Sequence, residues 1–108
     1  MRVFMSRVAI LMLLQIMSVA SALAGEAVQV KISDLAFTPA EITVRVGDIV
    51  EWVNDDFIDH TATATGADWD VMVLTGKSAQ LQLTRAGEFD YFCRFHPNMT
   101  GKIRVVSR

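Results

Sequence analysis

Cysteine and histidine are scarce in this sequence of 108 residues, which contains one cysteine and two histidines. A single cysteine cannot form a disulfide within the chain, and this excludes a small fold held together by internal disulfides. Basic residues are outnumbered as well, with 10 lysines and arginines against 12 acidic residues. Because the sequence has no basic excess and no basic stripe, nucleic acid is not an expected partner.

The first 24 residues have the pattern of a secretory signal rather than that of a folded segment. A basic start is followed by an apolar stretch over residues 8–17 and by the small-residue sequence ALA at 22–24. This order predicts a signal peptide over residues 1–24 that is cleaved before Gly25, and hence a periplasmic mature protein. Residues 25–108 are enough for one domain.

An uncleaved membrane anchor is the alternative for the same segment. Residues 8–24 are only marginally long enough to span a bilayer, and Gln15 and two serines weaken the stretch further. No cysteine lies near the cleavage point, which excludes a lipoprotein anchor. Arg2 and Arg7 are not adjacent, so the sequence favours export before folding over twin-arginine export. We therefore expect no stable membrane insertion, and loading of any metal outside the cytoplasm.

The predicted mature domain is mildly acidic, with 8 basic and 12 acidic residues and a net charge of −4. A domain of this size buries a modest fraction of its surface and often relies on a disulfide or a metal. An unpaired thiol is a liability in an oxidising compartment unless something protects it. Metal ligation by Cys93 would provide such protection.

Apolar and polar residues alternate along the mature chain, which predicts short strands separated by glycine, proline and asparagine turns. The expected strands are residues 28–33, 42–46, 49–54, 60–65, 79–83, 88–93 and 101–106. No stretch has a helical period. Seven short strands predict an all-β fold, an antiparallel β-sandwich with Greek-key connections. The residues expected in or near the core are Phe37, Trp52, Leu83, Phe89 and Tyr91.

The sequence CRFHPNM gathers the only cysteine, a histidine and a methionine between two predicted strands. Thiolate and thioether are soft ligands and imidazole is intermediate, so Cys93, His96 and Met99 together favour copper over magnesium, calcium or manganese. We expect Pro97 and Asn98 to turn the chain so that the three side chains face one point.

His60 is the remaining histidine and completes this ligand set. A trigonal copper site takes two histidines, a cysteine and a weak axial methionine. His60 begins a predicted strand 33 residues before Cys93, and the loops next to the two residues can meet at one end of a sandwich. Each residue alone has an ordinary interpretation: Cys93 as a buried thiol, the two histidines as surface residues and Met99 as a residue that fills the core. Their combination at this spacing predicts a metal site.

Two nearby features have no metal-binding role in this interpretation. Met72 lies in a loop or edge segment and is expected to pack against its neighbours. Asp55, Asp56 and Asp59 suggest a hard-metal site, but they lack the spacing and the glycine of a calcium loop. We expect them to form a solvated acidic loop.

The mature chain resembles the small blue-copper proteins of the cupredoxin family, and among these the amicyanin type. The resemblance rests on FTPAEITVRVGDIVEWVN, DHTATAT and TRAGEFDYFCRFHPNM. It implies a cupredoxin (plastocyanin-like) domain over residues 25–108 with one type 1 copper on His60, Cys93, His96 and Met99. It also implies a monomeric periplasmic one-electron carrier that is no enzyme. By analogy, an amine dehydrogenase would be its donor and a c-type cytochrome its acceptor.

Two residues depart from the family pattern. Thr61 stands where the family often has an asparagine that ties the two ligand loops together, so we expect a looser set of contacts around the ligands. Arg94 stands where a small residue is usual, and its positive charge is expected to raise the reduction potential.

One other function remains open at this point, and a third is disfavoured. The same four ligands suit a protein that delivers or buffers copper. A fragment of a multicopper oxidase or nitrite reductase would require more histidines than the two present. For a carrier, we expect electrons to pass at His96, within an apolar patch of Phe95, Pro97 and Phe57, and the neighbouring aspartates to steer a basic partner.

Overall fold

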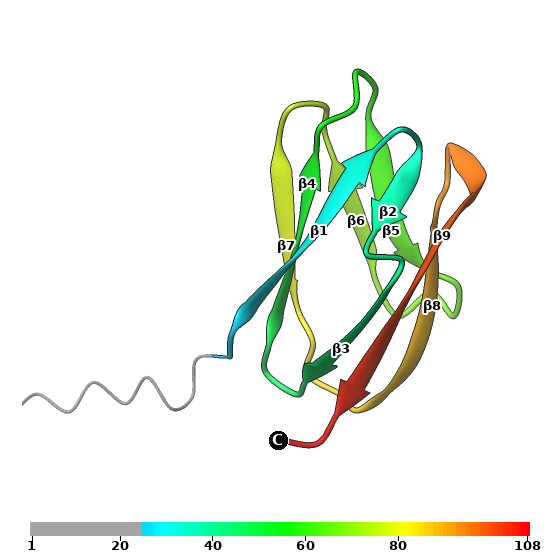
Figure 1. Ribbon diagram of the computed structural model, residues 1–108. Coiled ribbons are helices and arrows are strands. Elements are labelled where there is room, and N and C mark those ends of the chain that lie inside the picture. Colours follow the sequence, from blue (N-terminus) through cyan, green and yellow to red (C-terminus); the bar gives the residue numbers. More distant parts are fainter. Residues whose placement is uncertain (1–24) are drawn as a thin grey trace, which may run out of the picture.

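The computed structural model describes residues 25–108, and the predicted signal peptide at residues 1–24 lies outside them. Nine strands make up the fold: β1 Ala27–Ser33, β2 Ala36–Thr38, β3 Glu41–Arg45, β4 Ile49–Asn54, β5 His60–Ala64, β6 Asp70–Val73, β7 Ser78–Gln82, β8 Gly87–Cys93 and β9 His96–Val106. They form two sheets, with strand orders β2-β1-β4-β7 and β3-β9-β8-β5-β6, that pack as a sandwich (Figure 1). The predicted all-β sandwich is confirmed. Within residues 25–108, no helix is long and apolar enough to cross a membrane.

Two strand pairs are parallel, which corrects the expectation of purely antiparallel sheets. β1 runs parallel to β4, and β3 runs parallel to β9. Between β1 and β4 the chain crosses to the other sheet and back through β3, and between β3 and β9 it crosses four times, at β3–β4, β4–β5, β6–β7 and β7–β8. A strand that returns after such a crossing can lie beside an earlier strand in the same direction. Alternation in the sequence specifies which face of a strand is buried, but not the direction of its neighbour.

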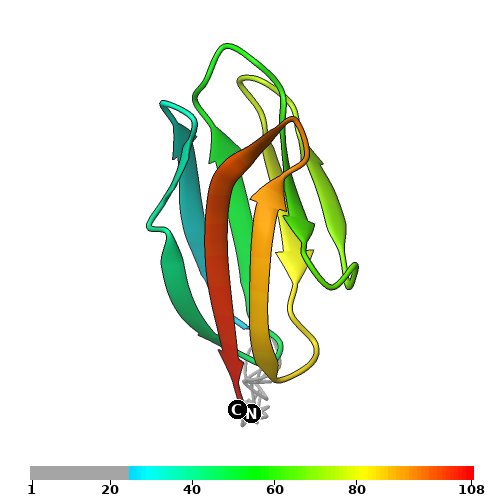
Figure 2. The same ribbon diagram turned by 90° about the vertical axis from the view of Figure 1, so that its right-hand side faces the viewer.

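The connection between β8 and β9 is shorter than the sequence predicts. Arg94 and Phe95 form a two-residue turn, and β9 already begins at His96 (Figure 2). Pro97 and Asn98 therefore lie within β9 and not in the turn, which corrects the expectation that these two residues make it. The ladder is irregular here, however: Cys93 pairs with His96 but Phe92 pairs with Thr100, so residues 97–99 bulge out of the pairing with β8. Proline is tolerated near the beginning of a strand, where the ladder does not require its missing N–H group.

Two strands were not expected. β2 has three residues and follows a turn in which Asp34 and Leu35 both have positive φ. β6 lies in the segment around Met72 that the sequence leaves as a loop or edge, and it is the edge strand next to β5. Short edge strands have few alternating positions, and the pattern therefore does not identify them.

Trp52 and Tyr91 form the centre of the core and connect the two sheets. Both side chains are buried, and the indole N–H of Trp52 donates to the hydroxyl of Tyr91 at 3.3 Å. The rings of Phe37 and Trp69 lie 4.6 Å and 5.6 Å from the ring of Tyr91. Burial raises the pKa of Tyr91 to about 12, although the hydrogen bond from Trp52 opposes this shift. As predicted, Leu83 is also buried.

Asp48 holds together the turn between β3 and β4. Its carboxylate accepts hydrogen bonds from the backbone N–H groups of Arg45, at 2.8 Å, and Glu26, at 3.1 Å, and it pairs with Arg108. The hydrogen bond from Arg45 lowers the pKa of Asp48 from its ordinary value. Burial opposes this shift, and the N–H of Glu26 and the charge of Arg108 reinforce it. The ionised carboxylate therefore stabilises the folded state.

We expect Asp48→Asn to lower the free energy of unfolding at neutral pH by about 1–3 kcal/mol, because a buried charged acceptor is lost. A carboxyl group whose pKa is lower in the folded state stabilises that state above its unfolded pKa, and this contribution disappears as the pH falls through its folded pKa. The difference between variant and wild type should therefore shrink below about pH 4. Urea unfolding across this range is the measurement, with the exposed Asp90→Asn as control. A difference that stays constant with pH would contradict the assignment.

Candidate functional site

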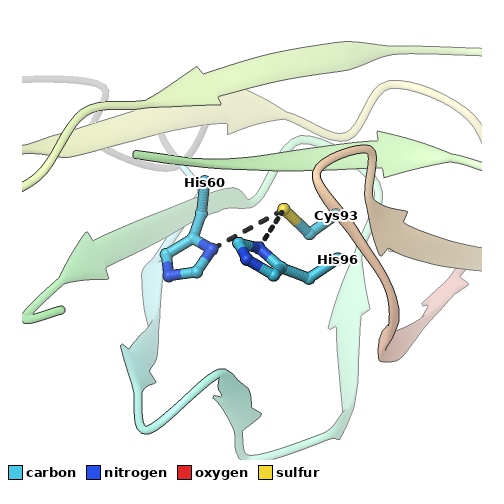
Figure 3. A group of neighbouring side chains, drawn as sticks. All are labelled: His60, Cys93 and His96. Atoms are coloured by element: carbon cyan, nitrogen blue, oxygen red, sulfur yellow. Dashed lines mark hydrogen bonds between the residues drawn. The ribbon is translucent and has the colours of Figure 1, made fainter. Parts of the chain in front are cut away.

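The pairing of β5 with β8 brings His60 and Cys93 together. The two strands pair at Thr63 with Phe92 and at Ala64 with Tyr91. Beyond the end of this short ladder, Nδ1 of His60 lies 3.6 Å from Sγ of Cys93, and both side chains are fully buried (Figure 3).

His96 reaches the same point from β9. The two-residue turn places it opposite Cys93 in the β8–β9 register, and its Nδ1 lies 3.9 Å from Sγ of Cys93 (Figure 3). The two imidazole rings have their centroids 5.3 Å apart. One donor atom from each of the three residues lies within 4.8 Å of the others. His60 and Cys93 are buried and His96 is half-buried, so the cluster opens to the surface at His96.

Met99 lies three residues further along β9 and is buried. It belongs to the same core cluster as Cys93, whereas Pro97 and Asn98 between it and His96 are exposed. The fourth residue of the predicted ligand set is thus inside the protein, on the strand that carries His96.

Asp56 fixes the ring of His60. Its Oδ2 lies 2.8 Å from Nε2 of His60, and its two oxygens accept hydrogen bonds from the backbone N–H groups of Asp34, at 2.7 Å, and Leu35, at 3.0 Å. Burial alone would raise the pKa of Asp56, but the hydrogen bonds from Leu35, His60 and Asp34 outweigh it and leave the pKa lowered. An ionised carboxylate only accepts, so Nε2 carries a proton, and in the neutral imidazole Nδ1 then presents its lone pair toward Cys93.

The acidic loop is therefore not simply solvated, as the sequence led us to expect. Asp59 accepts a hydrogen bond from the backbone N–H of Thr75 at 2.8 Å, and the hydroxyl of Thr75 donates to the carbonyl of Asp56. Asp55 and Asp59 are exposed as expected, and Oδ2 of Asp55 lies 3.6 Å from Nζ of Lys31. Sequence reasoning missed the role of Asp56, for which the four-residue spacing to His60 was the available signal.

Thr61 connects the two segments that carry the donor atoms. Its backbone N–H points at Sγ of Cys93 at 3.4 Å, and its hydroxyl oxygen accepts the backbone N–H of Arg94 at 2.9 Å. The side chain is fully buried. A threonine thus makes the connection, and the expected looser contacts around the ligands are not observed at this position.

Arg94 is not an isolated positive charge. Its Nε donates to Oδ1 of Asp70 at 3.1 Å, and its guanidinium lies 5.5 Å from the ring centre of Phe95. Because Asp70 offsets much of the charge, the reason for expecting a raised reduction potential is weakened.

The donor set fits copper. Two imidazole nitrogens and a sulfur converge in a largely buried site, and Asp56 supplies the outer contact that histidine ligands of metals ordinarily have. A thiolate with two imidazoles and a nearby thioether matches the preferences of copper better than those of the hard, oxygen-seeking cations.

Comparison with known proteins gives a consistent result. A family profile described as a cupredoxin-like domain matches residues 6–105. Amicyanin from Paracoccus denitrificans is 32% identical over 92 residues, which cover 80% of this chain and 70% of that protein. Amicyanin from Paracoccus versutus is 31% identical over 87 residues, covering 75% of this chain and 66% of that protein.

Solved structures are similar as well. A Cu(I) structure of an amicyanin mutant has a TM-score of 0.70 at 30% identity and covers 81% of this chain and 89% of that chain. A Cu-containing nitrite reductase from Thermus scotoductus SA-01 has a TM-score of 0.70 at 27% identity. The match covers 76% of this chain but 23% of that chain, so the similarity is to one part of the larger protein.

We expect Asp56→Ala to weaken copper binding by about 10–100-fold, because the outer contact that orients His60 is lost. Competition with a chelator measures the affinity, and nitrogen NMR of His60 in the metal-free protein reports whether the ring still keeps its proton on Nε2. The matched control is Asp55→Ala, which removes an exposed carboxylate from the neighbouring position. Equal effects of the two substitutions would show that charge, and not orientation of the ring, is responsible.

Proposed function

The chain belongs to the cupredoxin-like family, and on this premise we propose that it carries single electrons between redox proteins in the periplasm, with one copper held by His60, Cys93, His96 and Met99. The observation that supports this most directly is the convergence of two imidazoles and the only thiol within 4.8 Å. The exclusion of water from Cys93 and His60 adds to it, since both are fully buried.

Copper, when bound, supplies a one-electron couple between its +1 and +2 states. The residues around it keep the ligands still. Thr61 directs an N–H at the sulfur and thereby stabilises negative charge on it, and Asp56 prevents His60 from rotating. Because the strands hold the donor atoms in place, little rearrangement accompanies a change of one charge. This rigidity suits repeated electron transfer.

An electron carrier needs no group for substrate chemistry, and the ligand cluster already accounts for both histidines of the sequence. His60 and His96 are therefore not free to act as general bases. We accordingly propose that the protein is no enzyme. Copper delivery, the alternative role, is less well supported because the buried Cys93 and His60 give an acceptor protein little access to the ion.

The partner surface that we propose surrounds His96. The connections β1–β2, β4–β5, β6–β7 and β8–β9 lie at one end of the sandwich (Figure 1). They carry five exposed apolar residues, which we call the apolar end surface: Leu35, Phe57, Ile58, Leu74 and Phe95. Phe57 is 99% exposed, and Phe95 is 49% exposed directly next to His96. A small apolar surface around a half-buried ligand permits brief docking of a redox partner. By analogy with the family, the donor is an amine dehydrogenase and the acceptor a c-type cytochrome.

Replacing the sulfur ligand tests the proposed centre. We expect Cys93→Ser to abolish the intense blue colour of the oxidised copper protein, because a hydroxyl cannot provide the sulfur-to-copper charge transfer. Visible absorption spectra of wild type and variant, each loaded with one equivalent of copper(II), are the measurement. A blue variant would refute the role of Cys93, and a colourless wild type would refute the proposed centre itself.

The apolar end surface is tested by adding a charge to it. We expect Phe95→Glu to lower the second-order rate constant of electron transfer to a soluble c-type cytochrome about tenfold or more, because the new carboxylate must be desolvated on docking. Stopped-flow kinetics give the rate, and voltammetry checks that the potential is nearly unchanged. Val106→Glu, at the exposed C-terminal end of β9, is the matched control. Equal rates in wild type and Phe95→Glu would place the electron-transfer surface elsewhere.

A further inference from the structure

A closed ring of hydrogen bonds joins the turn between β8 and β9 to β5 and β6. The backbone N–H of Arg94 donates to the hydroxyl oxygen of Thr61 at 2.9 Å, and this hydroxyl lies 2.9 Å from that of Thr63. The hydroxyl of Thr63 donates to Oδ1 of Asp70 at 2.6 Å. The same oxygen of Asp70 accepts Nε–H of Arg94 at 3.1 Å, which closes the ring.

The protons in this ring have one arrangement. The hydrogen bonds from Thr63 and then Arg94 lower the pKa of Asp70, so its carboxylate is ionised at neutral pH and can only accept. Thr63 has a single hydroxyl proton and donates it to Asp70. The proton between the two threonines must therefore come from Thr61, whose oxygen is left to accept the N–H of Arg94. Within the ring each threonine hydroxyl then donates one hydrogen bond and accepts one, so each bond supports the next.

The ring spans the segments that carry the donor atoms. Thr61 follows His60 directly on β5, and Arg94 follows Cys93 directly at the start of the turn. Thr63 pairs with Asp70 in the register of β5 and β6, so the ring is attached to two sheet strands as well as to the turn. A shift of the turn away from β5 would break both bonds of Arg94. Such a shift would also change the distances between His60 and the other two ligands.

We propose that Thr63 and Asp70 are remote positioning residues: through Thr61 and Arg94 they hold the turn against β5 and keep the donor atoms clustered before the metal enters. Neither residue belongs to the donor cluster. The consequence for copper rests on the proposed function, whereas the restraint on the turn is a property of the protein chain alone. If the ring is broken, we expect the turn to become more mobile and a bound metal ion to be lost faster.

The sharpest test is Thr63→Val, which removes the hydroxyl with little change in shape and none in charge. In the metal-free protein we expect the backbone amide of Arg94 to exchange its hydrogen about tenfold faster or more than in wild type, because its acceptor Thr61 is no longer held. Thr63→Ser, which restores a hydroxyl, should return the wild-type rate. Thr43→Val, an exposed threonine on the edge strand β3, is the matched control and should leave the rate unchanged.

The second measurement is the rate at which the loaded protein loses copper(I) to a chelator, with cobalt(II) as an independent probe. We expect Thr63→Val to lose both ions about tenfold faster, and Thr63→Ser to behave like wild type. Should Thr63→Val fold poorly, Asp70→Ala at an exposed position makes the same prediction. Unchanged exchange of the Arg94 amide would overturn the proposal, and so would faster exchange with unchanged metal loss. A wild type that is not blue with copper would overturn the proposed function only, since amide exchange and cobalt loss still decide the role of the ring.

Discussion

The short pairing between β5 and β8 is the constraint on which the site depends. Its regular ladder ends at Thr63, and the strands beyond it are joined by other groups: the N–H of Thr61 points at the sulfur of Cys93, and the hydroxyl of Thr61 accepts the N–H of Arg94. A buried N–H that lacks a partner is costly, and here the sulfur supplies one. The thiol thus takes a place in the backbone hydrogen bonding of the sheet. Its position is set by the fold as well as by its own side chain.

Side-chain type and the alternation of apolar and polar residues are local properties of the sequence, and they correctly predicted the longer strands and the central core residues. The seven longer strands and the buried Trp52 and Tyr91 follow from residues read in order. The convergence of His60 with CRFHPNM was expected for a different reason, the ligand set that copper prefers and the family resemblance. The parallel neighbours of β1 and β3 depend on where the chain crosses between sheets. No pattern within one strand contains that information, because the same alternation serves either direction.

Charged residues were the least predictable part of the site. The sequence does not show whether a carboxylate faces water, a backbone N–H or an imidazole. Asp56 contacts two backbone N–H groups and the imidazole of His60. Its backbone partners are available because Asp34 and Leu35 adopt positive φ, a conformation unusual for these side chains. The charge of Arg94 is likewise matched by Asp70 from a strand that the sequence did not predict. Long-range packing decides such pairs.

The two-residue turn between Cys93 and His96 also limits how this protein can change in length. His96 lies opposite Cys93 only because two residues separate them, so one inserted residue at Arg94 or Phe95 would change this pairing and move the imidazole relative to the sulfur. Insertions and deletions should therefore accumulate in the exposed connection of residues 84–86, where no ligand depends on the count. In sequences descended from this one, the number of residues between the cysteine and the histidine should stay constant, whereas the length of the connection at the opposite end of the sandwich should vary.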